Sequence, residues 1–208
     1  MTNQLREYIE LRLTEFDQIS EERKPILQSL ADYVIDHQRN HETTKAVFIC
    51  IHNSRRSHLS QSWFAAAMSY FEIGDIESYS GGTEVTRIHP NAVATLNRAG
   101  FGITTDNEDE DNPRYMAQIG DATFLELYSK LYEDEDNPQS SFAAVMVCTT
   151  ADGNCPFVQG CDKRIVLPFT DPKEFDGTEK EAEGYDERCA QVAREMLWVA
   201  NETNKALL

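Results

Sequence analysis

The chain has 208 residues, of which 36 are Asp or Glu and 19 are Lys or Arg, giving a formal net charge of -17 at pH 7. This length predicts one domain, or one domain with an appended segment, that can bury a full core. The acidic balance disfavours nucleic acid and anionic membranes as partners. A site for an anionic substrate must therefore concentrate positive charge locally.

The chain shows neither a signal-peptide pattern nor an apolar run long enough to span a bilayer, so we expect a cytoplasmic protein without membrane contact. Its 5 cysteines are an odd number with unequal spacing. This argues against a secreted disulfide framework and favours reactive thiols in a reducing compartment.

Residues 1–43 predict two helices, because apolar residues recur at helical spacing before and after Pro25. They contain no plausible catalytic group. We expect a helical hairpin that packs on the core or on a second subunit, which makes a homodimer through these helices an open alternative. This extension would precede a catalytic domain at 44–208.

The most informative stretch runs from Ala46 to Leu59, where an apolar strand ends at Cys50 and a helix begins near Ser57. In such a turn the N–H groups of the loop and of the first helical turn converge on one point and attract a tetrahedral oxyanion. The predicted oxyanion-binding residues are Ile51, His52, Asn53, Ser54, Arg55 and Arg56.

Within this loop, the Arg56 guanidinium offers paired donors that match two oxygens of phosphate or arsenate. The same positive field favours the thiolate of Cys50, the form that attacks as a nucleophile. Ser57 is placed to cap the helix and to donate its hydroxyl to that thiolate.

The rest of the chain predicts strands that alternate with helices. Strands are expected at 76–80, 142–147 and 164–167, and helices at 58–71, 90–99 and 179–201. This alternation favours an α/β fold with a parallel sheet, in which ligands bind beyond the carboxyl ends of the strands. Cys50, Cys148 and Asp171 all follow strand ends, so we expect them to share one site.

Residues 106–141 are the least expected region. The hexapeptide Glu-Asp-Glu-Asp-Asn-Pro occurs at 108–113 and again at 133–138, around a stretch rich in aromatic residues. The spacing lacks the pattern of an EF-hand. We expect an acidic insertion that acts as a lid or a partner surface near the active site.

A second group of thiols lies at Cys148 and Cys155, seven residues apart across a polar segment. Four ligands in paired short spacings, as a structural zinc site requires, are absent from the sequence. A redox role fits better, in which Cys148 attacks a sulfur-bound adduct and Cys155 then reaches Cys148. Cys161 remains an alternative resolving thiol.

The strand, the loop and the Arg56-Ser57 pair resemble the low-molecular-weight tyrosine phosphatase superfamily. Within it, the set Cys50, Arg56-Ser57, Cys148, Cys155-Pro156 and Asp171-Pro172 resembles the thioredoxin-coupled arsenate reductases. The similarity spans about residues 45–200, interrupted by the acidic insertion. Two positions depart from the superfamily pattern, because His52 stands where glycine is usual and Arg55 where a second cysteine is frequent.

The resemblance implies a flavodoxin-like, three-layer fold with a four-stranded parallel sheet, here preceded by the helical hairpin. It implies that Cys50 attacks arsenate, Cys148 attacks the Cys50 adduct and Cys155 takes over the disulfide, which thioredoxin reduces. Asp171 is the implied general acid. A potassium site near Asn53 and Ser80 is also implied, although Gln61 stands where a carboxylate is common.

Arsenate reduction is therefore the leading prediction, with no tightly bound cofactor. The alternative is a phosphotyrosine or small-molecule phosphatase that uses Cys50, Arg56 and Asp171 alone. The two reactions share their first step and differ in what attacks next, a thiol or a water molecule. A third interpretation is a catalytically weak binding module, in which His52 distorts the loop.

Overall fold

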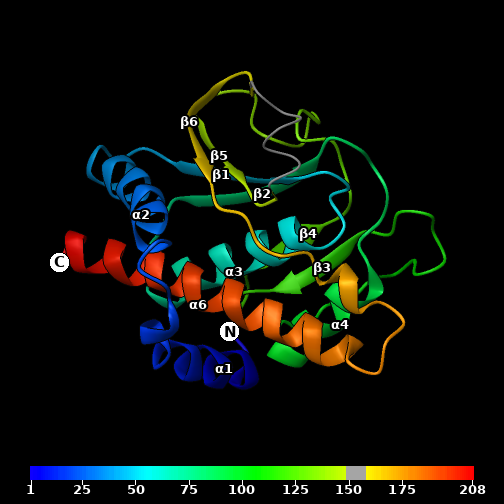
Figure 1. Ribbon diagram of the computed structural model, residues 1–208. Helices are drawn as coiled ribbons and strands as arrows, with labels where there is room; N and C mark the ends of the chain where they lie inside the picture. The colour runs from blue at the N-terminus through cyan, green and yellow to red at the C-terminus, as the bar shows by residue number, and fades with distance from the viewer. Residues whose placement is uncertain (149–157) are drawn as a thin grey trace.

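The computed structural model describes residues 1–148 and 158–208 (Figure 1). Four parallel strands form a sheet in the order β2-β1-β5-β6. Their bounds are β1 Thr44–Cys50, β2 Ile76–Gly82, β5 Phe142–Met146 and β6 Cys161–Val166. The predicted α/β class with a four-stranded parallel sheet is confirmed.

Two long helices, α3 (Arg56–Tyr70) and α6 (Glu181–Leu207), run beneath the sheet in Figure 1, and α4 (Pro90–Ala99) and α1 (Asn3–Leu13) lie beneath them. The helix α2 (Lys24–Arg39) packs against α6 and the edge strand β6. Two short 3-10 helices, η1 (Phe16–Gln18) and η2 (Pro172–Phe175), complete this set. The helices between strands bring the strand ends to one edge, where the site lies.

The core is one cluster that includes the N-terminal helices. Trp63 of α3 is fully buried, stacks on Tyr8 at 5.3 Å and meets the edge of Phe101 at 4.9 Å between ring centroids. Leu5 and Ile9 of α1 are fully buried in the same cluster. The division into an extension and a catalytic domain stays a prediction, but α1 shares its packing with the rest of the chain.

Gly100 shows how closely α1 lies on α4. This glycine ends α4 with a φ of 103°, and a Cβ placed on it would lie 2.4 Å from the backbone nitrogen of Leu5. The hydroxyl of Thr2, which caps α1, donates to the carbonyl oxygen of Gly100 at 2.7 Å. Glycine is required here both for the left-handed turn and for the close approach of the backbone.

The segment predicted as an acidic insertion contains an antiparallel hairpin of β3 (Tyr115–Gln118) and β4 (Phe124–Leu127). The chain then returns to the carboxyl end of β2, where the N–H of Gly82 donates to the carbonyl oxygen of Lys130 at 2.8 Å. At the same residue the insertion passes beside the loop that follows β1, because the N–H of Lys130 donates to the side-chain oxygen of Asn53 at 2.8 Å. Its predicted role as a lid or partner surface stays a prediction.

Two element boundaries differ from the sequence prediction. β6 begins at Cys161 instead of Arg164, because its first residues alternate between partly buried and exposed positions at the edge of the sheet. α6 continues to Leu207 instead of ending near Asn201. The last turns of α6 are rich in polar residues, so the apolar pattern does not predict them, although the buried side of the helix extends to Thr203.

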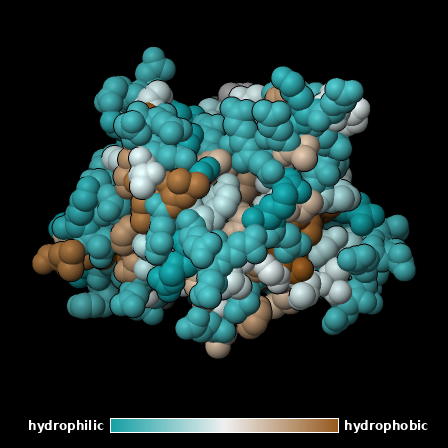
Figure 2. Space-filling view, turned by 90° about the horizontal axis from the view of Figure 1, so that it is seen from below, coloured by the Kyte–Doolittle hydropathy of each residue, from teal (hydrophilic) through white to brown (hydrophobic). Residues whose placement is uncertain are grey.

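The surface on the side of α1 is mostly hydrophilic, and its hydrophobic areas are small and separated by polar side chains (Figure 2). This agrees with the formal charge of -17. Within residues 1–148 and 158–208, none of the helices combines the length and the apolar character needed to cross a membrane.

Candidate active site

The loop between β1 and α3 turns its carbonyl groups outward. The carbonyl oxygens of residues 50–54 all accept hydrogen bonds from groups outside the loop. The donors belong to Thr83, Glu84, Thr86, His58 and His89. Because the C=O and N–H of a trans peptide point in opposite directions, the N–H groups of residues 51–55 face the other way. None of these N–H groups donates a bond to the described parts of the chain, so together they can bind an oxyanion.

The Cys50 thiol lies at the centre of this loop and is 4% exposed. Its Sγ is 3.1 Å from the Ser57 hydroxyl in the first turn of α3. The Asn53 side-chain amide donates to the same hydroxyl oxygen at 2.9 Å. The Ser57 oxygen can accept from Asn53 and still direct its own hydrogen at Sγ. Ser57 is therefore placed to donate a hydrogen bond to the attacking form of Cys50, as predicted.

Arg56 and Asp171 close the other side of the site. The Arg56 guanidinium donates to the Asp171 carboxylate at 2.6 Å and to the carbonyl oxygen of Phe169 at 3.1 Å. A small recess of about 10 Å³ lies among these groups. Its lining residues are Cys50, His52, Ser54, Arg55, Arg56 and Asp171. The structure therefore brings together the predicted nucleophile, the predicted guanidinium and the predicted acid.

Arg55 also lines the recess, but its guanidinium is bound elsewhere. Its Nε donates to the Tyr185 hydroxyl at 2.6 Å, and its Nη2 donates to the Asp176 carboxylate at 2.7 Å. Burial disfavours the charged guanidinium, yet the Tyr185 and Asp176 contacts raise the pKa of Arg55 above its usual value. The predicted oxyanion contact of Arg55 is therefore left to its backbone N–H.

Cys148 lies two residues beyond β5, the neighbour of the strand that ends at Cys50, and is 1% exposed. The N–H of Val147 donates to the carbonyl oxygen of Ile49 at 2.9 Å, so the strand pairing continues up to the two thiols. Cys155 lies outside the described residues. Cys161 pairs with Phe142 at the opposite, amino-terminal edge of the sheet.

Comparisons with known proteins agree with this geometry. No family model matches the chain. An arsenate reductase of Bacillus subtilis (strain 168) is 27% identical over 159 residues, covering 76% of this chain and 95% of that protein. An arsenate reductase of Bacillus cereus (strain G9842) is 28% identical over 125 residues, which cover 60% of this chain and 74% of that protein.

Among solved structures, a YwlE arginine phosphatase variant with a phosphorylated active-site serine aligns with a TM-score of 0.50 and 13% identity. The alignment covers 78% of this chain and 97% of that one, and it shows a shared fold. The chain therefore resembles the low-molecular-weight tyrosine phosphatases and arsenate reductases in sequence and in fold. Like these relatives, it is an enzyme.

His52, which replaces the glycine usual in the superfamily, leaves the turn intact. The positive φ of the loop, 43°, falls on Asn53, a residue type that tolerates the left-handed region. The His52 side chain is half exposed and lies 3.5 Å from the Glu84 carboxylate. The histidine therefore stands at the mouth of the recess instead of distorting its backbone.

Protein groups already form hydrogen bonds with the two residues that the resemblance implies as potassium ligands, Asn53 and Ser80. The His58 ring lies between the two expected ligands, with Nε2 2.9 Å from the carbonyl oxygen of Asn53 and Nδ1 3.3 Å from the Ser80 hydroxyl. The Asn53 amide oxygen accepts from the N–H of Lys130 at 2.8 Å. Burial, with the nearby Lys130 charge, lowers the pKa of His58 to about 3, so a neutral ring occupies this place. Potassium binding stays an untested prediction.

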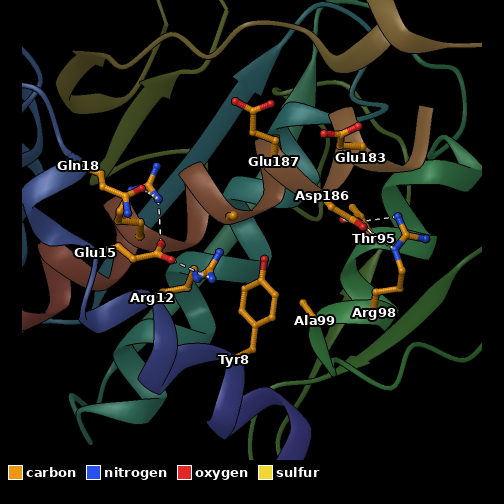
Figure 3. Close-up of a pocket in the computed structure, with 12 residues that line it drawn as sticks. Tyr8, Arg12, Glu15, Gln18, Thr95, Arg98, Ala99, Glu183, Asp186 and Glu187 are labelled. Carbon is orange, nitrogen blue, oxygen red and sulfur yellow. Dashed lines mark hydrogen bonds and ion pairs between the residues drawn. The ribbon is translucent and has the colours of Figure 1, made fainter. Parts of the chain in front are cut away.

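A second region, the helix cavity, has a volume of about 900 Å³ and lies between α1, α4 and α6 (Figure 3). On one wall Arg12 and Arg194 share the Glu15 carboxylate, each at 2.9 Å. On the other wall Arg98 pairs with Asp186 at 2.6 Å. All three arginines are thus bound to carboxylates, and no cysteine is among the lining residues. This cavity lacks the elements of an oxyanion-transfer site.

Sequence reasoning missed three residues that hold the active site. Tyr185 lies in the helix that the sequence predicts at 179–201 and is fully buried, but its hydroxyl also donates to Asp176 at 2.7 Å. His89 caps α4 by accepting from the N–H of Asn91 and lies 3.2 Å from the same hydroxyl. A second carboxylate five residues after Asp171 is the one sequence signal that points to Asp176.

Proposed function

We propose that the chain is an arsenate reductase that reduces arsenate to arsenite through a thiol relay. The observation that carries this proposal is the position of Cys148, two residues beyond β5, which pairs with the strand that ends at Cys50. Adjacent strands lie about 5 Å apart, which is within the Cα separation of about 7 Å that a disulfide allows. A phosphatase needs no second thiol at this place.

In the first step the Cys50 thiolate attacks the arsenic atom, and one arsenate oxygen leaves as water. The N–H groups of the loop and the Arg56 guanidinium hold the remaining oxygens, whose negative charge they offset. Asp171 supplies the proton to the leaving oxygen. The product is a bond between the Cys50 sulfur and arsenic in its original oxidation state.

In the second step the Cys148 thiolate attacks the Cys50 sulfur and forms a disulfide. The electron pair of the sulfur–arsenic bond stays with arsenic, which is thereby reduced by two electrons and leaves as arsenite. The two electrons come from the two thiols. Cys155 then attacks Cys148, which returns Cys50 as a thiolate and leaves a Cys148–Cys155 disulfide for thioredoxin.

The strand register argues against Cys161 as the resolving thiol. Cys161 pairs with Phe142, which lies six residues before Cys148 along an extended strand. At about 3.3 Å per residue, the two thiols are roughly 20 Å apart, far beyond disulfide distance. We therefore keep Cys155 in this role, although it lies outside the described residues.

The test is arsenate-dependent NADPH consumption with thioredoxin and thioredoxin reductase. We expect turnover by the unmodified protein, and turnover that stops after one cycle in Cys155→Ser. Cys161→Ser is the matched control and should keep the full rate. Continued turnover in Cys155→Ser would contradict the proposed relay, and arsenate-independent oxidation would contradict the proposed substrate.

The alternative is hydrolysis of a phosphate monoester by Cys50, Arg56 and Asp171. The ion pair that places Asp171 beside the oxyanion loop favours it, because an ester leaving group needs a proton donor at this position. Water would then attack the Cys50 adduct. Hydrolysis of an aryl phosphate that is equally fast in Cys148→Ser, without arsenate-dependent turnover, would identify this reaction.

Thioredoxin as partner and a cytoplasmic location follow from this proposal, because the relay needs a reducing dithiol. The homodimer has weaker support. Leu5, Ile9, Leu27 and Leu30 of the N-terminal helices are fully buried within the chain itself, so they are not left for a second subunit. A sedimentation measurement of the mass in solution decides between monomer and dimer.

A further inference from the structure

Two adjacent arginines of the catalytic loop hold one segment of the chain. The acid segment, residues 171–176, follows β6 and carries the proposed general acid at its start. Arg56 binds Asp171 at 2.6 Å, and Arg55 binds Asp176 at 2.7 Å. The segment is therefore attached to the loop at both of its ends.

The contact at Asp176 is partly buried, and both carboxylate oxygens of Asp176 accept hydrogen bonds. The Tyr185 hydroxyl accepts from Arg55 and donates to one Asp176 oxygen, while Arg55 donates to the other. The Arg55 side chain is 13% exposed. These contacts, against the effect of burial, hold the pKa of Asp176 below its usual value. Burial and the Arg55 charge lower the pKa of neighbouring His89, which favours its neutral form.

Packing fixes the same end of the segment. Phe175 lies against Gly184 on α6, where a Cβ would come within 2.2 Å of the Phe175 ring. Gly184 thus permits a close approach that a larger residue would block. Arg55, Asp176, Tyr185 and Phe175 together dock the end of the acid segment on α6, independently of Asp171.

The contact at Asp171 is different, because the Arg56 guanidinium that binds Asp171 is also the proposed ligand of the oxyanion. The recess of about 10 Å³ holds no more than one water molecule while Arg56 and Asp171 are joined. An oxyanion therefore has to separate them and take over the Arg56 donors. The proposed proton transfer from Asp171 to the leaving oxygen then takes place while Arg56 is engaged with the oxyanion.

We propose that Arg55 is a positioning residue that holds the acid segment over Cys50 while Arg56 binds the oxyanion. Without it, Asp171 would leave the site at the moment when its proton is needed. This assignment rests on the proposed first step and applies equally to arsenate and to a phosphate ester. It differs from the sequence prediction, which gave Arg55 an oxyanion contact.

The first test requires neither substrate nor activity. Asp171→Asn removes the ion pair to Arg56, Arg55→Ala removes the pair to Asp176, and the double variant removes both. Amide hydrogen exchange is followed at Asp176 and Thr178, whose N–H groups donate to carbonyl oxygens within the segment at 3.0 Å. Each single variant should stay within about threefold of the unmodified rate, and the double variant should exchange more than about tenfold faster.

Additive effects in the double variant, or full loss of protection in Asp171→Asn alone, would overturn the proposal. Arg98→Ala is the matched control, since it breaks another arginine–aspartate pair that is 44% exposed on both sides. It should leave exchange in the acid segment unchanged. Because the exchange experiment needs no catalytic turnover, its result does not depend on whether the protein reduces arsenate.

The second test separates acid positioning from oxyanion binding. Hydrolysis of phenyl phosphate depends on a general acid, whereas 2,4-dinitrophenyl phosphate has a leaving group that needs little protonation. Arg55→Ala should slow the first substrate by about 10- to 100-fold and the second by less than about threefold, because general acid catalysis contributes about 10²- to 10⁴-fold. Arg55→Lys should restore part of the loss.

Inhibition by inorganic phosphate distinguishes the remaining outcomes. The proposal expects an inhibition constant within about threefold of the unmodified protein, since the loop N–H groups and Arg56 remain. Equal losses on both esters with weaker phosphate inhibition would instead make Arg55 an oxyanion ligand. Tyr185→Phe, which removes one hydroxyl from the same contact, should show the leaving-group effect of Arg55→Ala in weaker form.

Discussion

The active-site loop and the helix cavity are both lined by arginines and carboxylates, yet they differ in how each arginine is paired. In the helix cavity Arg12 and Arg194 share Glu15, and Glu15 lies beside Arg12 on one side of the cavity (Figure 3). In the loop, Arg56 is paired with Asp171, which lies on a separate segment after β6. An arginine is available to a ligand when its carboxylate can move away.

A second difference concerns the neighbouring donors. The active-site loop adds backbone N–H groups and the Cys50 thiol to its guanidinium, whereas the helix cavity adds more carboxylates, including Glu183 and Glu187. A tetrahedral oxyanion is attracted to the first surrounding and repelled by the second. The contrast therefore favours the loop, and not the larger hollow, as the place where an oxyanion binds. The following predictions test this contrast.

The largest effect is expected for Cys50→Ser. A serine hydroxyl at this place has no adjacent general base in the described structure, so it cannot replace the thiolate. Loss of the nucleophile should lower both arsenate reduction and ester hydrolysis by at least about 10⁴-fold. Phosphate binding should persist, because the loop N–H groups are unchanged. Turnover that survives in this variant would remove Cys50 as the nucleophile.

Arg56→Lys should have the next largest effect. A lysine keeps the charge but lacks the planar pair of donors, so we expect a loss of about 10²- to 10³-fold in kcat/KM. Arg194→Lys in the helix cavity is the matched change and should leave kcat/KM within about twofold. Similar losses in both variants would show that charge, not the paired donors, matters in the loop.

The active-site loop could be predicted from sequence because its parts are consecutive. A buried strand, a short loop and a helix start within Thr44–Tyr70 place the thiol, the N–H groups and the guanidinium without help from distant residues. The meeting of Cys148 and Asp171 with this loop could also be predicted, since parallel strands bring their carboxyl ends to one edge.

The pairing of the arginines could not be predicted in this way. Arg55 meets Tyr185, 130 residues further along the chain, and Glu15 meets Arg194 across 179 residues. Such contacts depend on how α6 lies against the loop and against α1, which hydrophobic periodicity does not encode. Tyr185 belongs to a helix that the sequence predicts, but the position of a residue in a helix does not reveal what its hydroxyl binds.

Glu15→Gln tests the paired arginines of the helix cavity. Arg12, Glu15 and Arg194 are about 15% exposed, and the amide would leave two guanidinium groups without a carboxylate. We expect a loss of about 2 kcal/mol in the free energy of unfolding, because uncompensated buried charge is costly. Activity should not change. Glu183→Gln, at an exposed position on the same cavity, is the control and should change stability by less than about 0.5 kcal/mol.

The smallest effect concerns Lys130, a cation beside the catalytic loop that has no ion pair among the described residues. Its side chain is almost fully buried and its Nζ lies 4.2 Å from the centre of the Tyr128 ring. Burial lowers the pKa of Lys130 from 10.5 to about 8. The folded protein therefore stabilises this charge less well than water does.

Lys130→Met should consequently stabilise the protein at pH 7 by about 1 kcal/mol, after the lost contact with Tyr128 is counted. Between pH 8 and 10.5 the unfolded chain keeps the Lys130 proton that the folded protein has released, so the stability of the unmodified protein rises with pH in this window. The advantage of the methionine variant should therefore shrink as the pH rises. Urea unfolding of both proteins at pH 7 and pH 9.5 measures the difference between their free energies of unfolding. The other titrating groups are the same in both proteins, so their effects cancel in this difference. A constant difference at both pH values would mean that Lys130 is solvated in the folded protein, and a destabilised variant would mean that its contacts outweigh the cost of its burial.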